Sequence, residues 1–72
     1  MLFTKTDVGK LFERKRLIFY IDGSIKEEIT PFLCIEVYDA FYASFFNLKT
    51  IKEERWIPAL GKMAGESLTR II

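Results

Sequence analysis

Hydrophobic and polar residues follow a clear β-type pattern near the middle of the chain. Residues 17–21 (LIFYI) are rich in β-branched and aromatic side chains, which are typical of strands. Asp22-Gly23 follows directly and is a strong hairpin signal, because both central positions of a type I′ turn need positive φ. The pattern predicts a strand over 17–21 and a hairpin turn after it.

The residues after this turn fit two structures. Ser24 and Glu27 have the spacing of a capping box that opens a helix, whereas Ile25 and Ile29 also suit a short return strand. Pro31 would remove a hydrogen bond from a helix interior and favours extended geometry before it. One long helix across this region is therefore disfavoured.

Residues 32–48 (FLCIEVYDAFYASFFNL) are the most aromatic part of the chain. Alternation of Leu33, Ile35 and Val37 with other residues predicts a strand over 32–38, and a second strand follows over 41–48. A helix that starts at Thr30-Pro31 is the alternative, because threonine is a good cap and proline a good first residue.

The same segment predicts association with another chain. It holds six of the eleven aromatic residues. Each buried ring removes roughly 150–250 Å² from water, and a domain of this size buries only about 60 % of its unfolded surface. We expect some of these rings to contact a second protein.

The two ends of the chain give weaker signals. Residues 4–10 (TKTDVGK) predict either a short helix or a turn before a strand over 10–14, and Gly9 weakens the helix. Thr50 and Glu53 form a second candidate capping box before good helix formers. An apolar stripe at helical spacing follows. Its members are Ile57, Leu60, Ala64, Leu68 and Ile71.

Together these elements predict one α+β domain over residues 1–72. A small curved antiparallel sheet of three or four strands, at about 10–48, would be covered by a C-terminal helix at about 51–71.

Composition narrows the functional classes. The net charge of +1 gives no global field toward nucleic acid or anionic lipid, and Glu36 and Asp39 argue against a membrane span over 32–48. The first ten residues lack the apolar region of a signal peptide. A single cysteine, Cys34, suits a reduced compartment. The sequence thus indicates a cytoplasmic protein.

No pattern of catalytic or metal-binding residues stands out. The chain has no histidine, which removes the usual general base and the commonest zinc ligand. Residues 61–67 (GKMAGES) have the letters of a phosphate-binding loop in the wrong order. Glu36 and Asp39 would point to opposite faces of a strand. We therefore predict a protein that is not an enzyme, with no cofactor and no metal.

The stretch from Thr4 to about Tyr20 resembles the start of short β-rich proteins encoded by phages and prophages. The resemblance lies in Asp7, Val8, Gly9 and Lys10 of TKTDVGK. Most such proteins have no assigned function, and many small phage proteins bind and disable a host protein. The resemblance implies a regulatory protein that modulates a host protein, and it supplies no site residues.

The leading functional hypothesis is a protein-interaction module that self-associates, most simply as a dimer, or binds a host protein. The candidate interface residues are Tyr38, Phe41, Tyr42, Phe45, Phe46 and Trp56.

Two further hypotheses stay open. A nucleic-acid-binding regulator would use the basic cluster of Lys10, Arg14, Lys15 and Arg16, with Phe12, Phe19 and Tyr20 as stacking platforms. A small-molecule-binding protein would use a pocket between sheet and helix, with aromatic walls and Glu36.

Overall fold

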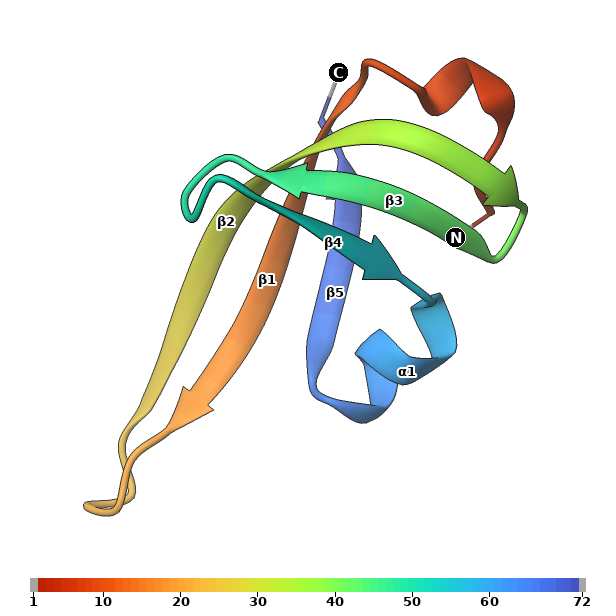
Figure 1. The fold of residues 1–72 in the computed structure, drawn as a ribbon. Coiled ribbons are helices and arrows are strands. Elements are labelled where there is room, and N and C mark those ends of the chain that lie inside the picture. Colours follow the sequence, from red (N-terminus) through yellow and green to blue (C-terminus); the bar gives the residue numbers. More distant parts are fainter. Residues whose placement is uncertain (1, 72) are drawn as a thin grey trace.

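A five-stranded antiparallel sheet in the order β4-β3-β2-β1-β5 dominates the computed structural model, which describes residues 2–71 (Figure 1). The elements in chain order are the 3₁₀ turn η1 (Lys5–Asp7), β1 (Leu11–Phe19), β2 (Ile25–Asp39), β3 (Tyr42–Asn47), β4 (Lys52–Trp56), the helix α1 (Pro58–Met63) and β5 (Glu66–Arg70).

Strand β2 gives the sheet its shape. Its first part pairs with β1, from Ile25 opposite Phe19 to Leu33 opposite Leu11, and from Phe32 onward it also pairs with β3. Register shifts interrupt the β2–β3 ladder between Cys34 and Glu36 and again after Val37. Such bulges bend a strand and increase its twist. Figure 1 shows β2 curving across the molecule, so that the sheet wraps around its own inner face.

The core fills this inner face with aromatic rings. Phe45 lies at its centre, with ring centroids 5.0 Å from Phe12, 5.6 Å from Phe3 and 5.9 Å from Phe32. The Phe3 and Phe12 rings meet Phe45 edge to face, which is a favourable aromatic arrangement. Other buried apolar residues complete the cluster: Cys34, Val37, Ala43, Trp56 and Leu68.

Asp7 fastens the N-terminal segment to the last strand. Its carboxylate accepts hydrogen bonds from the Thr4 backbone N–H at 2.9 Å and from the Arg70 guanidinium at 2.5 Å. Burial favours the neutral acid, but these donors favour the carboxylate, and the pKa of Asp7 lies below its ordinary value. Asp7 thus holds a buried charge that the folded protein stabilises.

The strands expected in the first half are present, with different boundaries. Residues 17–19 lie in β1, which ends at Phe19, whereas Tyr20 and Ile21 lie outside the strand, before the turn at Asp22-Gly23. Gly23 takes a φ of 88°, whereas Asp22 does not take positive φ and accepts hydrogen bonds from the backbone and hydroxyl of Ser24. The turn is therefore not type I′. Residues 25–39 form one strand, β2, so neither a helix at Ser24 nor one at Thr30-Pro31 exists.

The prediction of a sheet of three or four strands covered by a C-terminal helix at 51–71 is wrong. In its place, β4 and β5 add two strands to the sheet, and α1 spans just Pro58–Met63. Helix propensity in KEERW is a weak preference, and pairing with β3 and burial of Trp56 outweigh it. Of the predicted apolar stripe, Leu68 is buried, as a strand residue opposite Arg14.

Replacing Gly61 with alanine should destabilise the protein, although this change usually stabilises a helix by roughly 1 kcal/mol. A Cβ at this position would overlap Cζ2 of Trp56 and lie 2.6 Å from Cη2. The indole is buried and cannot move aside freely, so we expect Gly61→Ala to lower the free energy of unfolding by about 1–3 kcal/mol in urea titrations. Met63→Ala, on an exposed side chain of the same helix, is the control and should change little. An equally stable Gly61→Ala variant would contradict the contact.

The contribution of Asp7 to stability should depend on pH. Because the folded-state pKa is lowered, the stabilisation is present above the unfolded-state pKa of about 3.9 and is lost as the pH falls through the folded-state value. Asp7→Asn should therefore be less stable than wild type at pH 7, by about 1–3 kcal/mol. The difference should shrink steadily below about pH 4. Unfolding free energies measured from pH 7 to pH 2 test this, and a constant difference would refute it.

Candidate interaction surface

The far ends of β1 and β2 form a two-stranded arm that extends away from the core, which we define as residues 17–29 (Figure 1). Strand β5 pairs with β1 only as far as Arg16, and β3 pairs with β2 only from Phe32. The molecule measures 43 × 23 × 19 Å along its principal axes, which reflects this extension. An isolated two-stranded ribbon is marginally stable in water, so contact with another surface would stabilise the arm.

One face of the arm is apolar and exposed. Residues directly opposite each other on antiparallel strands share a face, and here Phe19 lies opposite Ile25, Leu17 opposite Glu27 and Lys15 opposite Ile29. Phe19 retains 69 % of its surface and Ile25 retains 60 %. We call Lys15, Leu17, Phe19, Ile25, Glu27 and Ile29 the arm face.

The opposite face of the arm is more polar. Arg16 donates a hydrogen bond to Glu28 at 2.6 Å, and the next cross-strand pair is Ile18 with Lys26. This face continues the inner surface of the sheet, which also carries Phe12 and Arg14. Alternation along β1 therefore assigns the exposed apolar residues to the outer face.

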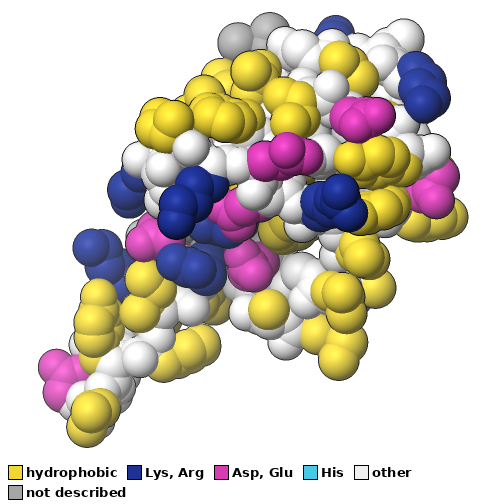
Figure 2. Space-filling view, viewed as in Figure 1, with side chains coloured by type: hydrophobic (Ala, Val, Ile, Leu, Met, Phe, Trp, Pro, Cys, Tyr) yellow, Lys and Arg dark blue, Asp and Glu magenta, His cyan; other side chains and the backbone are white. Residues whose placement is uncertain are grey.

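The tip of the arm adds further apolar surface. Ile21 is fully exposed beside the Asp22-Gly23 turn, and Tyr20 is also exposed. Figure 2 shows hydrophobic side chains following the arm to its tip, with charged side chains mixed at its base and an acidic side chain near the tip. The arm is thus an extended apolar projection.

The predicted interface residues separate into core and surface. Phe45 and Trp56 are buried and hold the fold, so they present no surface to a partner. Tyr42 and Phe46 are half-buried, while Tyr38 and Phe41 are exposed. The structure does not gather the six into one patch.

Tyr38 and Tyr42 form a smaller cluster with Arg55 on the outer face of the sheet. Their ring centroids are 4.7 Å apart, and Arg55 donates a hydrogen bond to the Tyr42 hydroxyl at 2.9 Å. Desolvation and then the neighbouring Glu36 carboxylate raise the pKa of Tyr38. The guanidinium already contacts both rings, so the charged and aromatic groups of this cluster have partners within the chain itself.

The predicted basic cluster is divided between the two faces of β1. Arg14 is buried, and Arg16 is paired with Glu28. Lys15 lies on the outer face, 4.0 Å from Glu13, and Lys10 is exposed before the strand begins. Because these charges point in different directions and two are neutralised, their arrangement does not favour binding to a nucleic-acid backbone.

Arg14 occupies a site of its own at the open side of the sheet. Its guanidinium lies 3.1 Å from Glu54 of β4 and 3.5 Å from Glu66 of β5. The guanidinium carbon lies 4.7 Å from the centre of the Phe32 ring. Asn47 donates a further hydrogen bond to Glu54 at 2.7 Å. The cluster links β1 to both edge strands of the sheet.

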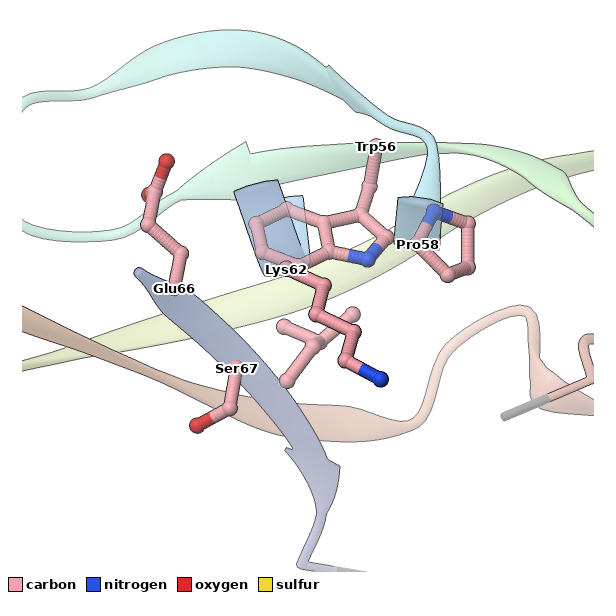
Figure 3. Close-up of a pocket in the computed structure, with 6 residues that line it drawn as sticks. Trp56, Pro58, Lys62, Glu66 and Ser67 are labelled. Atoms are coloured by element: carbon pink, nitrogen blue, oxygen red, sulfur yellow. The ribbon is translucent and has the colours of Figure 1, made fainter. Parts of the chain in front are cut away.

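A hollow of about 250 Å³ lies beside Trp56, between α1 and β5 (Figure 3). Its walls come from Trp56, Pro58, Lys62, Glu66, Ser67 and Leu68. Figure 3 shows the Lys62 side chain extending past the indole ring. Glu36, the carboxylate expected in a pocket between sheet and helix, does not line this hollow. The hollow is open and shallow, and its lining residues do not converge on a ligand of definite chemistry.

Within the described chain, three features bear on metal binding, cysteine reactivity and membrane insertion. Residues 2–71 contain no group of His, Cys, Asp or Glu side chains placed to hold a metal ion. Burial raises the pKa of the Cys34 thiol, which favours the less nucleophilic protonated form. No helix in the described range is long and apolar enough to cross a membrane.

Comparison with known proteins gives no relative. No protein-family model, no curated protein and no solved structure matches the chain.

The predicted interface residues do not include the arm face, although the sequence holds a signal of its apolar character. Residues 17–21 are apolar at every position, so a strand there presents apolar side chains on both faces. The sequence predicts Phe19 and Tyr20 as stacking platforms for nucleic acid and gives Leu17, Ile25 and Ile29 no interface role. Their exposure depends on where β5 and β3 stop pairing.

Removing the Arg14 side chain should destabilise the fold severely. Arg14→Ala would leave the Glu54 and Glu66 carboxylates without the cation that both of them contact, at a cost of about 3 kcal/mol. This cost is at the lower end of the range for breaking buried ion pairs, because the Glu54 side chain is 38 % exposed to solvent. Arg14→Lys keeps the positive charge but loses the planar guanidinium, so this variant should lose less unfolding free energy than Arg14→Ala. Chemical denaturation measures both, and an Arg14→Ala variant as stable as wild type would contradict the bridging role.

Proposed function

We propose that this protein is an interaction module, not an enzyme, and that it binds through the exposed apolar surface of the β1–β2 arm. The observation that carries the proposal is the arm face, with its exposed Phe19 and Ile25, on a projection that lies outside the core. Exposed apolar surface of this kind is typical of sites that bind other proteins.

The amount of exposed apolar surface supports the proposal. The large hydrophobic residues of the arm are Leu17, Phe19, Tyr20, Ile21, Ile25 and Ile29. Together they expose the equivalent of roughly four complete side chains, or on the order of 700 Å². The largest apolar patch on a typical monomer is roughly 300–600 Å². The arm thus exposes an apolar area comparable with the largest patch of a typical monomer, divided between the arm face and the tip.

The shape of the arm also supports binding. Among the described strands, none pairs with the outer edge of β1 beyond Arg16 or with the outer edge of β2 before Phe32. Free edges beside an apolar face invite pairing with a partner chain. We place this activity in the cytoplasm, because Cys34 is a free, buried thiol suited to a reducing compartment. By covering a surface of its partner, the arm would compete with other molecules that bind the same surface, and this competition would give the protein a regulatory role.

We expect binding to a partner protein to depend on the arm and not on the rest of the fold. In Phe19→Thr/Ile25→Thr, threonine keeps strand propensity and removes the apolar surface. We expect the thermal stability to change little, because both side chains are exposed. The dissociation constant of any complex should rise roughly a hundredfold. Light scattering on purified protein and cross-linking in expressing cells, with mass-spectrometric identification, measure this.

Phe41→Thr/Leu48→Thr is the matched control. It also removes one exposed phenylalanine and one exposed aliphatic side chain, from the turns at either end of β3. The control should form the same complexes as wild type. If complexes persist in the arm variant, or if the control loses them instead, the arm is not the binding element.

A further inference from the structure

We infer that the partner of the arm face is the arm face of a second copy of this chain, packed about a two-fold axis parallel to the arm. This inference rests on the proposed function and adds the identity of the partner. A two-fold interface requires a surface that is complementary to itself, and the arm face meets this requirement in apolar pattern and in charge.

The apolar residues match under this symmetry. An axis parallel to the arms lays β1 of one copy over β2 of the other, in the same row. Phe19 then lies over Ile25 of the second copy, because these two residues share a row in one chain. In the next row, Leu17 lies over the aliphatic stem of Glu27. Each contact occurs twice, as expected for an interface in which both copies use the same patch.

The charges also match. The arm face carries one basic residue, Lys15 on β1, and one acidic residue, Glu27 on β2, in adjacent rows. In the packed pair, each Lys15 lies one row from Glu27 of the second copy, within reach of its long side chain. The face has no net charge of its own, so two copies meet without repulsion, and each Lys15, which lies 4.0 Å from Glu13 in its own chain, gains Glu27 of the second copy as a further partner.

The size and shape of the surface suit a dimer. A standard interface buries roughly 800 Å² on each partner. The four apolar residues of the arm face expose the equivalent of roughly two complete side chains, on the order of 400 Å², and the exposed side chains of Lys15 and Glu27 extend this surface. The inner face of the sheet holds the core, and the arm face lies on the opposite side of β1 and β2. The two cores would therefore lie on opposite sides of the paired arms.

Charge reversal tests the pairing directly. Lys15→Glu makes the face wholly acidic, and Glu27→Lys makes it wholly basic. Each variant alone should dimerise at least tenfold more weakly than wild type, because like charges meet twice in its homodimer. An equimolar mixture of the two should associate as tightly as wild type. Sedimentation velocity over a range of concentrations, at low and high salt, measures all three samples.

Lys26→Glu is the matched control, since it makes the same charge change on the opposite face of the arm, beside Ile18. It should dimerise like wild type. If the single variants dimerise normally, or if mixing fails to restore association, the arm-to-arm pairing is refuted. A wild-type protein that stays monomeric at millimolar concentration also refutes it. In that case, the comparison of Phe19→Thr/Ile25→Thr with its control variant in cells still tests the proposed function. A complex with a different protein that depends on Phe19 and Ile25 would support that function.

Discussion

The guanidinium of Arg14 closes the sheet, and the rest of the architecture depends on this closure. Strands β4 and β5 are the two edges of the sheet and are not paired with each other in the described chain. Arg14, from the strand beside β5, reaches Glu54 on one edge and Glu66 on the other while it stacks on Phe32. A buried arginine is tolerated there because carboxylates and an aromatic face replace part of its hydration, although its Nε has no hydrogen-bond partner within the described residues. With the edges linked, the curved sheet encloses the aromatic core on a short chain.

The same curvature explains the arm. A strand of fifteen residues such as β2 is longer than either neighbour can cover, so its first part pairs with β1 alone. The bulges that bend β2 over the core lie near its far end, after Cys34, and leave the near end extended. Phe32 and Cys34 just before the bend and Val37 beyond its first bulge are buried in the core, whereas Ile25 and Ile29, farther from the bend, stay on the surface. The division between the buried inner face and the exposed apolar arm depends on where β5 and β3 stop pairing with β1 and β2.

This division changes the meaning of the aromatic residues. The expectation that some rings meet another chain was based on residues 32–48, where six of them lie. In the structure, Phe32 and Phe45 pack in the core, Tyr38 and Tyr42 contact each other and Arg55, and Phe41 is exposed in the turn before β3. The coherent apolar surface belongs to the arm, whose Phe19 is more exposed than Phe41. A high local density of rings is thus a poor guide to an interface when a curved sheet can enclose them.

By itself, the sequence determined the local structure of the first half: a strand rich in β-branched residues, a turn at Asp22-Gly23 and a strand through residues 32–38. These features arise from backbone preferences that operate over a few residues. Only the tertiary structure decided that KEERW is a strand, because its pairing with β3 and the burial of Trp56 outweigh its helix propensity. Only the tertiary structure likewise decided that Arg14 lies inside and Phe19 outside. The register with β5 and β3, which are distant in sequence, determines which part of β1 is covered.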